Sequence, residues 1–99
     1  MTQQIPREIA ADIGRLLRKL AEFGYRPTGS LYSAESAGNY YVDLAAGETW
    51  LRIVRDRGQY LIDTASKDHL KDAGLFRAFD DRVALEDALL AWLRPGAPG

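Results

Sequence analysis

The sequence predicts an α+β domain, with helices at the two ends of the chain and an antiparallel sheet between them. Over the first quarter of the chain, apolar residues recur at steps of three and four, the period of a helix that is buried on one side. Between residues 28 and 64, apolar and polar residues alternate, as they do in strands. After residue 66 the helical period returns.

The first predicted helix covers about residues 6–23. Its apolar stripe consists of Ile5, Ile9, Ile13, Leu16, Leu17, Leu20 and Phe23. Pro6 suits the first turn of a helix, because its missing N–H would have no partner there. Gly24 can adopt the left-handed conformation that ends many helices, and Pro27 prevents continuation. Gly14 weakens the middle of the helix by about 1 kcal/mol relative to alanine, but it can also mark close packing against the sheet.

Four strands are predicted in the middle of the chain, and the first of them has the weakest pattern. They cover residues 28–34, 39–45, 49–55 and 59–64. Consecutive strands that are joined by short turns must run antiparallel, so the sheet should be a meander of three or four strands.

The turn at Asp56-Arg57-Gly58 admits two registers. A two-residue type I′ loop would force Arg57 to a positive φ, which arginine tolerates poorly. A type I turn ending in a left-handed Gly58, with a G1 bulge, avoids this strain and is favoured on turn chemistry. The predicted pairs are then Arg55 with Gln59 and Ile53 with Leu61. The other register would move Tyr60 and Ile62 to the opposite face of the sheet.

One or two helices are predicted after the sheet, packed on one of its faces. The first covers residues 67–73, with Ser66 as its cap and Gly74 at its end. Apolar anchors then follow in a connecting segment, at Leu75, Phe76 and Phe79.

The last predicted helix covers about residues 82–93, and Asp80 or Asp81 is its expected cap.

The 99 residues of the chain suit one domain, which we expect over residues 1–94. The tail at 95–99 contains two prolines and two glycines, so it should be flexible.

The pleat divides the strand residues between two faces. The face expected beneath the helices is nearly all apolar and carries Tyr40, Val42, Leu44, Leu51, Ile53 and Leu61. The other face is more polar and more aromatic, with Tyr41, Asp43, Trp50, Arg52, Val54, Tyr60 and Ile62. Segment 66–79 or a second copy of the chain could cover this face. The alternative is a partner-binding surface, because Trp, Tyr and Arg are the usual hot-spot residues of interfaces. The candidate binding residues are Tyr41, Trp50, Arg52, Arg57 and Tyr60.

Composition and charge argue against several classes of function. The chain has 13 basic and 14 acidic side chains, and the two signs alternate along it. Nucleic acid is therefore not an expected partner, because no strong positive field forms. The sequence has no cysteine, which favours a reducing, cytoplasmic compartment. We expect no membrane association, because no apolar run approaches the ~20 residues of a membrane span.

Catalytic and metal-binding candidates are few, and we do not expect an enzyme. His69 is the only histidine, and it lies in a charged run that is typical of a solvated surface. No cluster of ligands with the spacing of a metal site occurs, and no cofactor is expected. The serines lack a Gly-x-Ser-x-Gly elbow. Asp80 and Asp81 would point apart on a helix, so they suit a cap better than an acid/base pair.

Segments Tyr40–Leu44 and Trp50–Tyr60, followed by a short acidic helix rich in leucine, resemble small bacterial immunity-type proteins. The similarity covers roughly residues 28–93 and rests on the strand–Asp-Arg-Gly–strand hairpin. It implies a cytosolic protein that binds and blocks a cognate toxin or effector domain. Such families share no catalytic residues and vary in their contact surfaces, so the resemblance assigns no site residue. The alternative is a self-associating structural or secretion-chaperone-like domain, in which the same face forms a homodimer.

Overall fold

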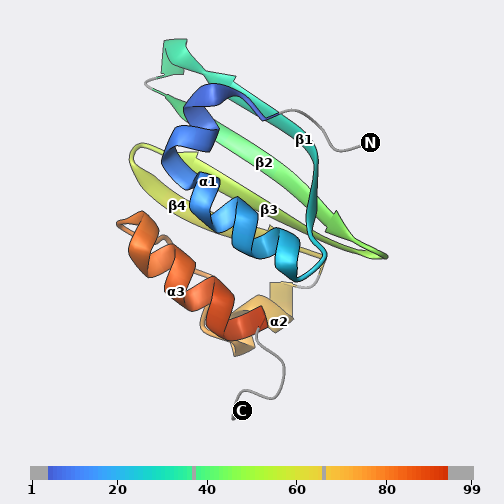
Figure 1. The fold of residues 1–99 in the computed structure, drawn as a ribbon. Coiled ribbons are helices and arrows are strands. Elements are labelled where there is room, and N and C mark those ends of the chain that lie inside the picture. The colour runs from blue at the N-terminus through green and yellow to red at the C-terminus, as the bar shows by residue number, and fades with distance from the viewer. Residues whose placement is uncertain (1–4, 37, 66, 94–99) are drawn as a thin grey trace.

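The computed structural model describes residues 5–36, 38–65 and 67–93. The expected cap at Ser66 and the expected flexible tail at 95–99 lie outside these residues. Helices α1 and α3 lie on the same side of a four-stranded antiparallel sheet, with the short helix α2 near one end of α3 (Figure 1). The predicted α+β fold is confirmed.

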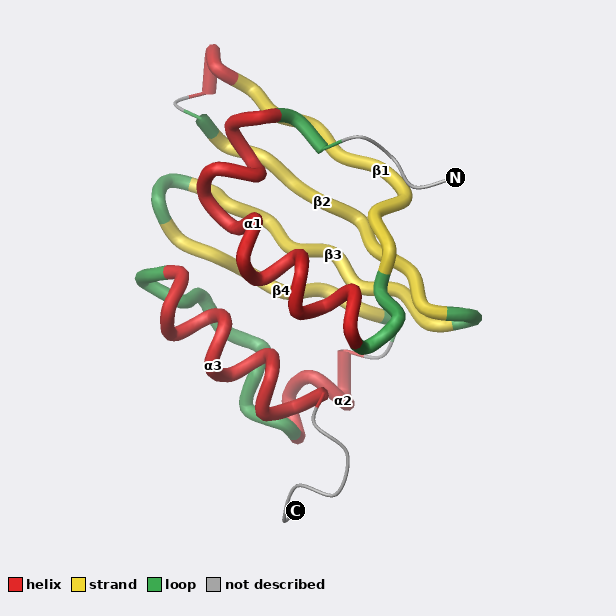
Figure 2. Tube along the Cα trace, in the orientation of Figure 1, coloured by secondary structure: helices red, strands yellow, loops and turns green. Residues whose placement is uncertain are grey.

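The elements follow one another along the chain with short connections. They are α1 (Arg7–Glu22), β1 (Arg26–Ser33), the 3-10 turn η1 (Ala34–Ser36), β2 (Asn39–Ala46), β3 (Thr49–Asp56), β4 (Gln59–Thr64), α2 (Lys67–Asp72) and α3 (Arg82–Leu93). The strand order β1-β2-β3-β4 is a simple meander, which Figure 2 shows as neighbouring yellow strands. Each predicted helix and strand is present, with ends displaced by at most two residues.

The helix ends follow the expected local chemistry. Gly24, just after α1, has a φ of 89°, which is the left-handed conformation that glycine adopts without strain. Asp81 caps α3, because its Oδ1 accepts a hydrogen bond from the Ala84 N–H at 2.8 Å. Inside α1, Ile13 departs from helical geometry with φ −125° and ψ 20°, so the helix is kinked beside Gly14.

The β3–β4 hairpin uses the two-residue loop, and the predicted G1 bulge is wrong. The observed pairs are Asp56 with Gln59, Arg55 with Tyr60 and Ile53 with Ile62. Arg57 and Gly58 have φ values of 54° and 79°, both positive as a type I′ loop requires. A neighbouring strand holds this turn, because the Asn39 side-chain oxygen accepts a hydrogen bond from the Arg57 N–H at 3.0 Å. That contact spans 18 residues and offsets the local preference of arginine.

This register decides which side chains enter the core. Tyr60 and Ile62 lie on the helix-covered face, and only 4% of Tyr60 is exposed. Tyr60 was predicted to bind a partner from the open face, and that prediction is wrong because the side chain is buried under α1. Leu61 faces the other way and is 38% exposed. The one-residue shift therefore exchanges an aromatic for an aliphatic side chain on the open face.

The core lies between the covered face of the sheet and the helices. It contains the buried stripe of α1, namely Ile9, Ile13, Leu16 and Leu20. The strands contribute Val42, Leu44, Leu51, Ile53 and Ile62, and α3 contributes Leu85, Leu89 and Leu90. Because these apolar side chains all lie on one side of the sheet, they leave the opposite face exposed.

Candidate protein-binding face of the sheet

An apolar row crosses all four strands on the uncovered face of the sheet. Leu31 of β1 pairs with Tyr41 of β2, Tyr41 pairs with Val54 of β3, and Val54 pairs with Leu61 of β4. Directly opposed residues in neighbouring strands point to the same face, so these four side chains lie next to one another. Leu31 and Leu61, at the two ends of the row, are 56% and 38% exposed. We call Leu31, Tyr41, Val54 and Leu61 the apolar row.

A rigid polar group lies beside this row. The guanidinium of Arg52 donates two hydrogen bonds to the carboxylate of Asp43, with Nε–Oδ1 at 2.6 Å and Nη2–Oδ2 at 2.9 Å. Its Cζ atom lies 4.2 Å from the centroid of the Tyr41 ring, within cation–π distance. The hydrogen bond to Asp43 raises the pKa of Arg52, which stays charged. We call these three residues the Tyr41–Arg52–Asp43 stack.

Two shallow hollows adjoin the stack. One has a volume of about 290 Å³, and its lining includes Leu31, Ser33, Asn39, Tyr41, Val54 and Leu61. The other has a volume of about 340 Å³ and is lined by Thr28, Asp43, Leu44, Trp50 and Arg52. A pre-ordered aromatic and arginine centre between hollows is the arrangement that interface hot spots share.

The charges of the open face balance. The strands present Asp43, Asp56 and Asp63 on it, together with Arg52 and with the exposed Arg26, which pairs with Ala45 and so lies on the same face. Asp43 is neutralised by Arg52, and Arg57 adjoins Asp56 in the turn. Arg26 then offsets the charge of Asp63, so a partner with both signs of charge around an apolar centre would complement this surface.

Four of the five predicted binding residues lie on or beside the open face, and the fifth, Tyr60, does not. Tyr41 and Arg52 lie at the centre. Trp50 lies two residues before Arg52 on the same face of β3, with 40% of its surface exposed. Arg57 is exposed in the β3–β4 turn at the edge of the face. Tyr60 is on the other side.

Leu31 and Leu61 belong to the face but were missed. The weak pattern of the first strand concealed Leu31, and the wrong register placed Leu61 in the core.

Segment 67–79 does not cover the open face. Instead, Phe79 forms an antiparallel bridge to the edge of β4, where Tyr60 N–H donates to Phe79 O at 2.8 Å and Phe79 N–H donates to Tyr60 O at 2.7 Å. The segment therefore extends the sheet at one edge. His69, within it, is exposed, and its ring packs edge-on against the Trp92 ring at a centroid distance of 5.6 Å.

A second polar group lies on the covered side of the sheet, around Asp12 of α1. Its Oδ2 accepts hydrogen bonds from the hydroxyls of Tyr40 and Tyr60, both at 2.7 Å. Burial and then the bond to Asp12 raise the pKa of Tyr60 to about 12, and the same causes raise the pKa of Tyr40 still further above its usual value. Both phenols therefore remain protonated donors near neutral pH, and the group ties α1 to the sheet.

Over 5–36, 38–65 and 67–93, no three His, Cys, Asp or Glu side chains gather as metal ligands would. Within the same part of the chain, no helix has the length and apolar character needed to cross a membrane. Comparison with protein-family models, with curated proteins and with solved structures found no match to this chain.

Proposed function

We propose that this protein is a non-catalytic binding module that holds another protein against the open face of its sheet. The observation that carries the proposal is the apolar row beside the Tyr41–Arg52–Asp43 stack. Exposed apolar side chains normally occur singly on a soluble surface, whereas here exposed Leu31 and Leu61 are joined by the half-buried Tyr41 and Val54 into one contiguous row. Tyr41 and Arg52 are already held in place by their mutual contact, so little side-chain entropy would be lost on binding.

The size of the face suits an interface of standard dimensions. A stable complex buries about 800 Å² on each partner. That area is roughly an eighth of the 6426 Å² accessible surface of this chain. A four-stranded sheet of this length can supply it from one face.

The partner that we propose is a toxin or effector domain, which this protein neutralises as an immunity-type protein. The resemblance of the hairpin segment to such proteins motivates the choice. An inhibitor of this kind would act in the cytoplasm of the cell that makes the toxin. The absence of cysteine is compatible with that reducing compartment.

The alternative is a self-associating domain, in which two copies of the chain pack face to face through the same apolar row. Light scattering of the purified chain separates the two readings. A stable dimer that finds no other partner would favour the self-associating domain.

Co-expression with a toxin domain encoded beside the gene for this protein tests the proposal. We expect the two chains to co-purify and growth to be restored. Arg52→Ala and Leu61→Ala should each weaken the complex by about 2 kcal/mol, or roughly thirtyfold in Kd, because both side chains lie at the proposed contact.

The matched controls are Phe76→Ala and Val83→Ala, which remove exposed apolar side chains away from the face. They should leave Kd unchanged. Equal Kd values for all four variants and the wild type would show that the partner binds elsewhere.

A further inference from the structure

The two outer strands of the sheet differ in how their edges are used. In the order β1-β2-β3-β4, each outer strand presents a row of backbone groups away from its neighbour (Figure 1). The β4 edge is occupied in part, because Tyr60 and Phe79 exchange two backbone hydrogen bonds. Among residues 5–36, 38–65 and 67–93, none pairs with the outer edge of β1.

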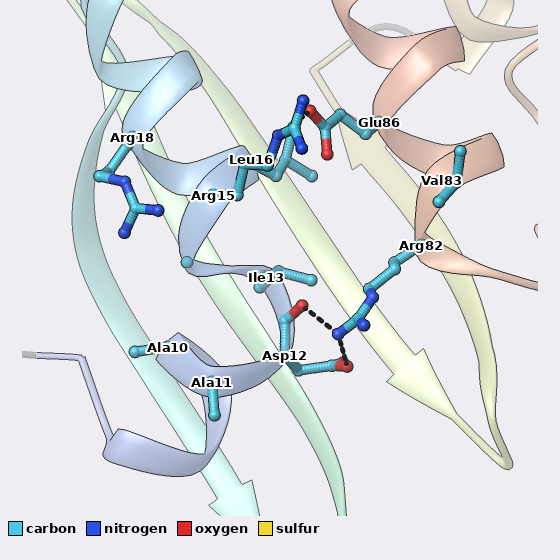
Figure 3. A pocket seen from close by; sticks show the side chains of 11 residues that line it. Ala10, Ala11, Asp12, Ile13, Arg15, Leu16, Arg18, Arg82, Val83 and Glu86 are labelled. Carbon is cyan, nitrogen blue, oxygen red and sulfur yellow. Dashed lines mark hydrogen bonds and ion pairs between the residues drawn. The ribbon is translucent and has the colours of Figure 1, made fainter.

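Ion pairs between the helices hold the segment that occupies the β4 edge. Helix α3 begins at Arg82, three residues after Phe79. Arg82 Nη1 lies 3.6 Å from Asp12 Oδ1 of α1, as the dashed lines in Figure 3 mark. Further along, Arg15 Nε of α1 lies 3.3 Å from Glu86 Oε1 of α3. An added strand would have to displace Phe79 at β4, whereas β1 can accept a strand without such a rearrangement.

The register shows which backbone groups of β1 point outward. Ala46 closes the two-residue turn between β2 and β3, so it is hydrogen-bonded to β3. Hydrogen-bonded and non-hydrogen-bonded pairs alternate in an antiparallel ladder, so every second residue of β2, including Tyr41, bonds to β1 instead. Leu31 pairs with Tyr41, and its N–H and C=O therefore point inward. Ser30 and Tyr32, on either side of Leu31, point theirs away from the sheet.

The second half of β1 is suited to accept another strand. Charges, prolines and bulges usually protect the edges of sheets. In β1 these features lie at the start, where Arg26 and Pro27 precede a register shift between Pro27 and Gly29. Segment 29–33 is uncharged and keeps a regular register with β2. At its centre, Leu31 is 56% exposed on the open face.

We propose that β1 pairs with β1 of a second copy of this chain, antiparallel and about a twofold axis. Ser30 of one copy then pairs with Tyr32 of the other, and each such pair exchanges two backbone hydrogen bonds. Leu31 lies on the axis opposite Leu31 of the other copy, as a non-hydrogen-bonded pair with Cα atoms about 4.5 Å apart. The two exposed leucines cover each other, and the two apolar rows join end to end.

A second copy fits this edge because the edge is complementary to itself. Twofold rotation brings the outward groups of Ser30 onto those of Tyr32, as a symmetric interface requires. Segment 29–33 carries no charge, so the two copies do not repel each other there. The paired segment is short, so the dimer is weak, with a Kd of about 100 µM or more. Edge pairing leaves the open face of each copy exposed, so it does not depend on the partner proposed above.

Sedimentation equilibrium of the full chain, from about 10 µM to about 1 mM, tests this proposal together with amide hydrogen exchange. We expect a monomer–dimer equilibrium. The amides of Ser30 and Tyr32 should become more protected as the concentration rises, whereas the amide of Leu31, which is bonded within the chain, should be equally protected throughout. A monomer at every concentration would overturn the proposal. Protection of Ser30 and Tyr32 that does not depend on concentration would also overturn it, because the edge would then be covered within one chain.

Charge variants test the position of the axis. Leu31→Lys and Leu31→Glu should each raise the dimer Kd at least about tenfold, because like charges would meet on the axis. An equimolar mixture of the two variants should restore association, since lysine and glutamate then face each other. The matched control Leu61→Lys adds a charge at the other end of the apolar row, on β4, and should dimerise as the wild type does. The proposal is wrong if the mixture fails to associate, or if Leu61→Lys weakens the dimer as much as Leu31→Lys.

Ser30→Pro tests the backbone hydrogen bonds separately from the side chains of the open face. Proline is tolerated in an edge strand where its nitrogen faces solvent, so the circular dichroism spectrum should be unchanged. The dimer Kd should rise at least about tenfold, because an outward N–H is lost from each copy. A folded Ser30→Pro variant that dimerises as strongly as the wild type would show that β1 does not pair through its backbone.

Discussion

At the scale of single residues, two aspartates with similar hydrogen-bonding chemistry should contribute differently to stability. Asp12 accepts two bonds from tyrosine hydroxyls whose rings are buried, so its removal would leave buried donors without an acceptor. Asp43 accepts two bonds from Arg52, which is partly exposed and can be solvated instead. Distance alone does not distinguish the two pairs, because all four bonds are between 2.6 and 2.9 Å long.

We therefore predict that Asp12→Ala lowers the free energy of unfolding by about 2–4 kcal/mol. Asp43→Ala should lower it by less than about 1 kcal/mol. Urea denaturation followed by circular dichroism measures both values. A loss at Asp43 as large as that at Asp12 would contradict the distinction between buried and solvated donors.

At the scale of elements, the β3–β4 hairpin carries local strain that the rest of the fold compensates. Arg57 is the one described non-glycine residue with a positive φ, and left-handed geometry costs an ordinary L-residue about 1–2 kcal/mol. The Asn39 hydrogen bond and the burial of Tyr60 and Ile62 offset that cost. The alternative register would place both side chains on the open face and remove the hydroxyl of Tyr60 from Asp12.

We predict that Arg57→Asn raises the free energy of unfolding by about 0.5–1 kcal/mol, because Asn-Gly is the preferred type I′ pair. Gly58→Ala should lower it by at least about 1 kcal/mol, since the φ of 79° suits glycine. Thermal unfolding of the two variants tests whether the β3–β4 turn has the two-residue conformation. If Arg57→Asn were destabilising, the two-residue loop would not be the conformation in solution.

The sequence was sufficient for the element boundaries but not for this register. Helix and strand limits depend on apolar periods, on Gly24 and on Asp81, all of which act within a few residues. The register depends on Asn39 and Asp12, which lie 18 and 48 residues from the groups they contact. Turn chemistry alone therefore favoured the wrong loop.

At the scale of the whole molecule, one face of the sheet forms the core and the other is the face that we propose binds a partner. Tyr41, Trp50 and Arg52 could be assigned to the open face because the alternation of β2 and β3 is strong. The four-stranded extent of the apolar row was not predictable, because it requires the pairing of β1 with β2 and of β3 with β4.

The absence of cysteine allows a direct footprint of the open face. Leu31→Cys introduces a thiol at one end of the apolar row, and Val83→Cys introduces one at the start of α3, on the helix side. In the complex with the co-expressed toxin domain, maleimide should modify Leu31→Cys at least about tenfold more slowly than in the free chain, because a well-packed interface excludes reagent and water. The rate for Val83→Cys should not change. Unchanged reactivity at Leu31→Cys, with protection at Val83→Cys, would place the partner on the helices and contradict the proposed use of the sheet.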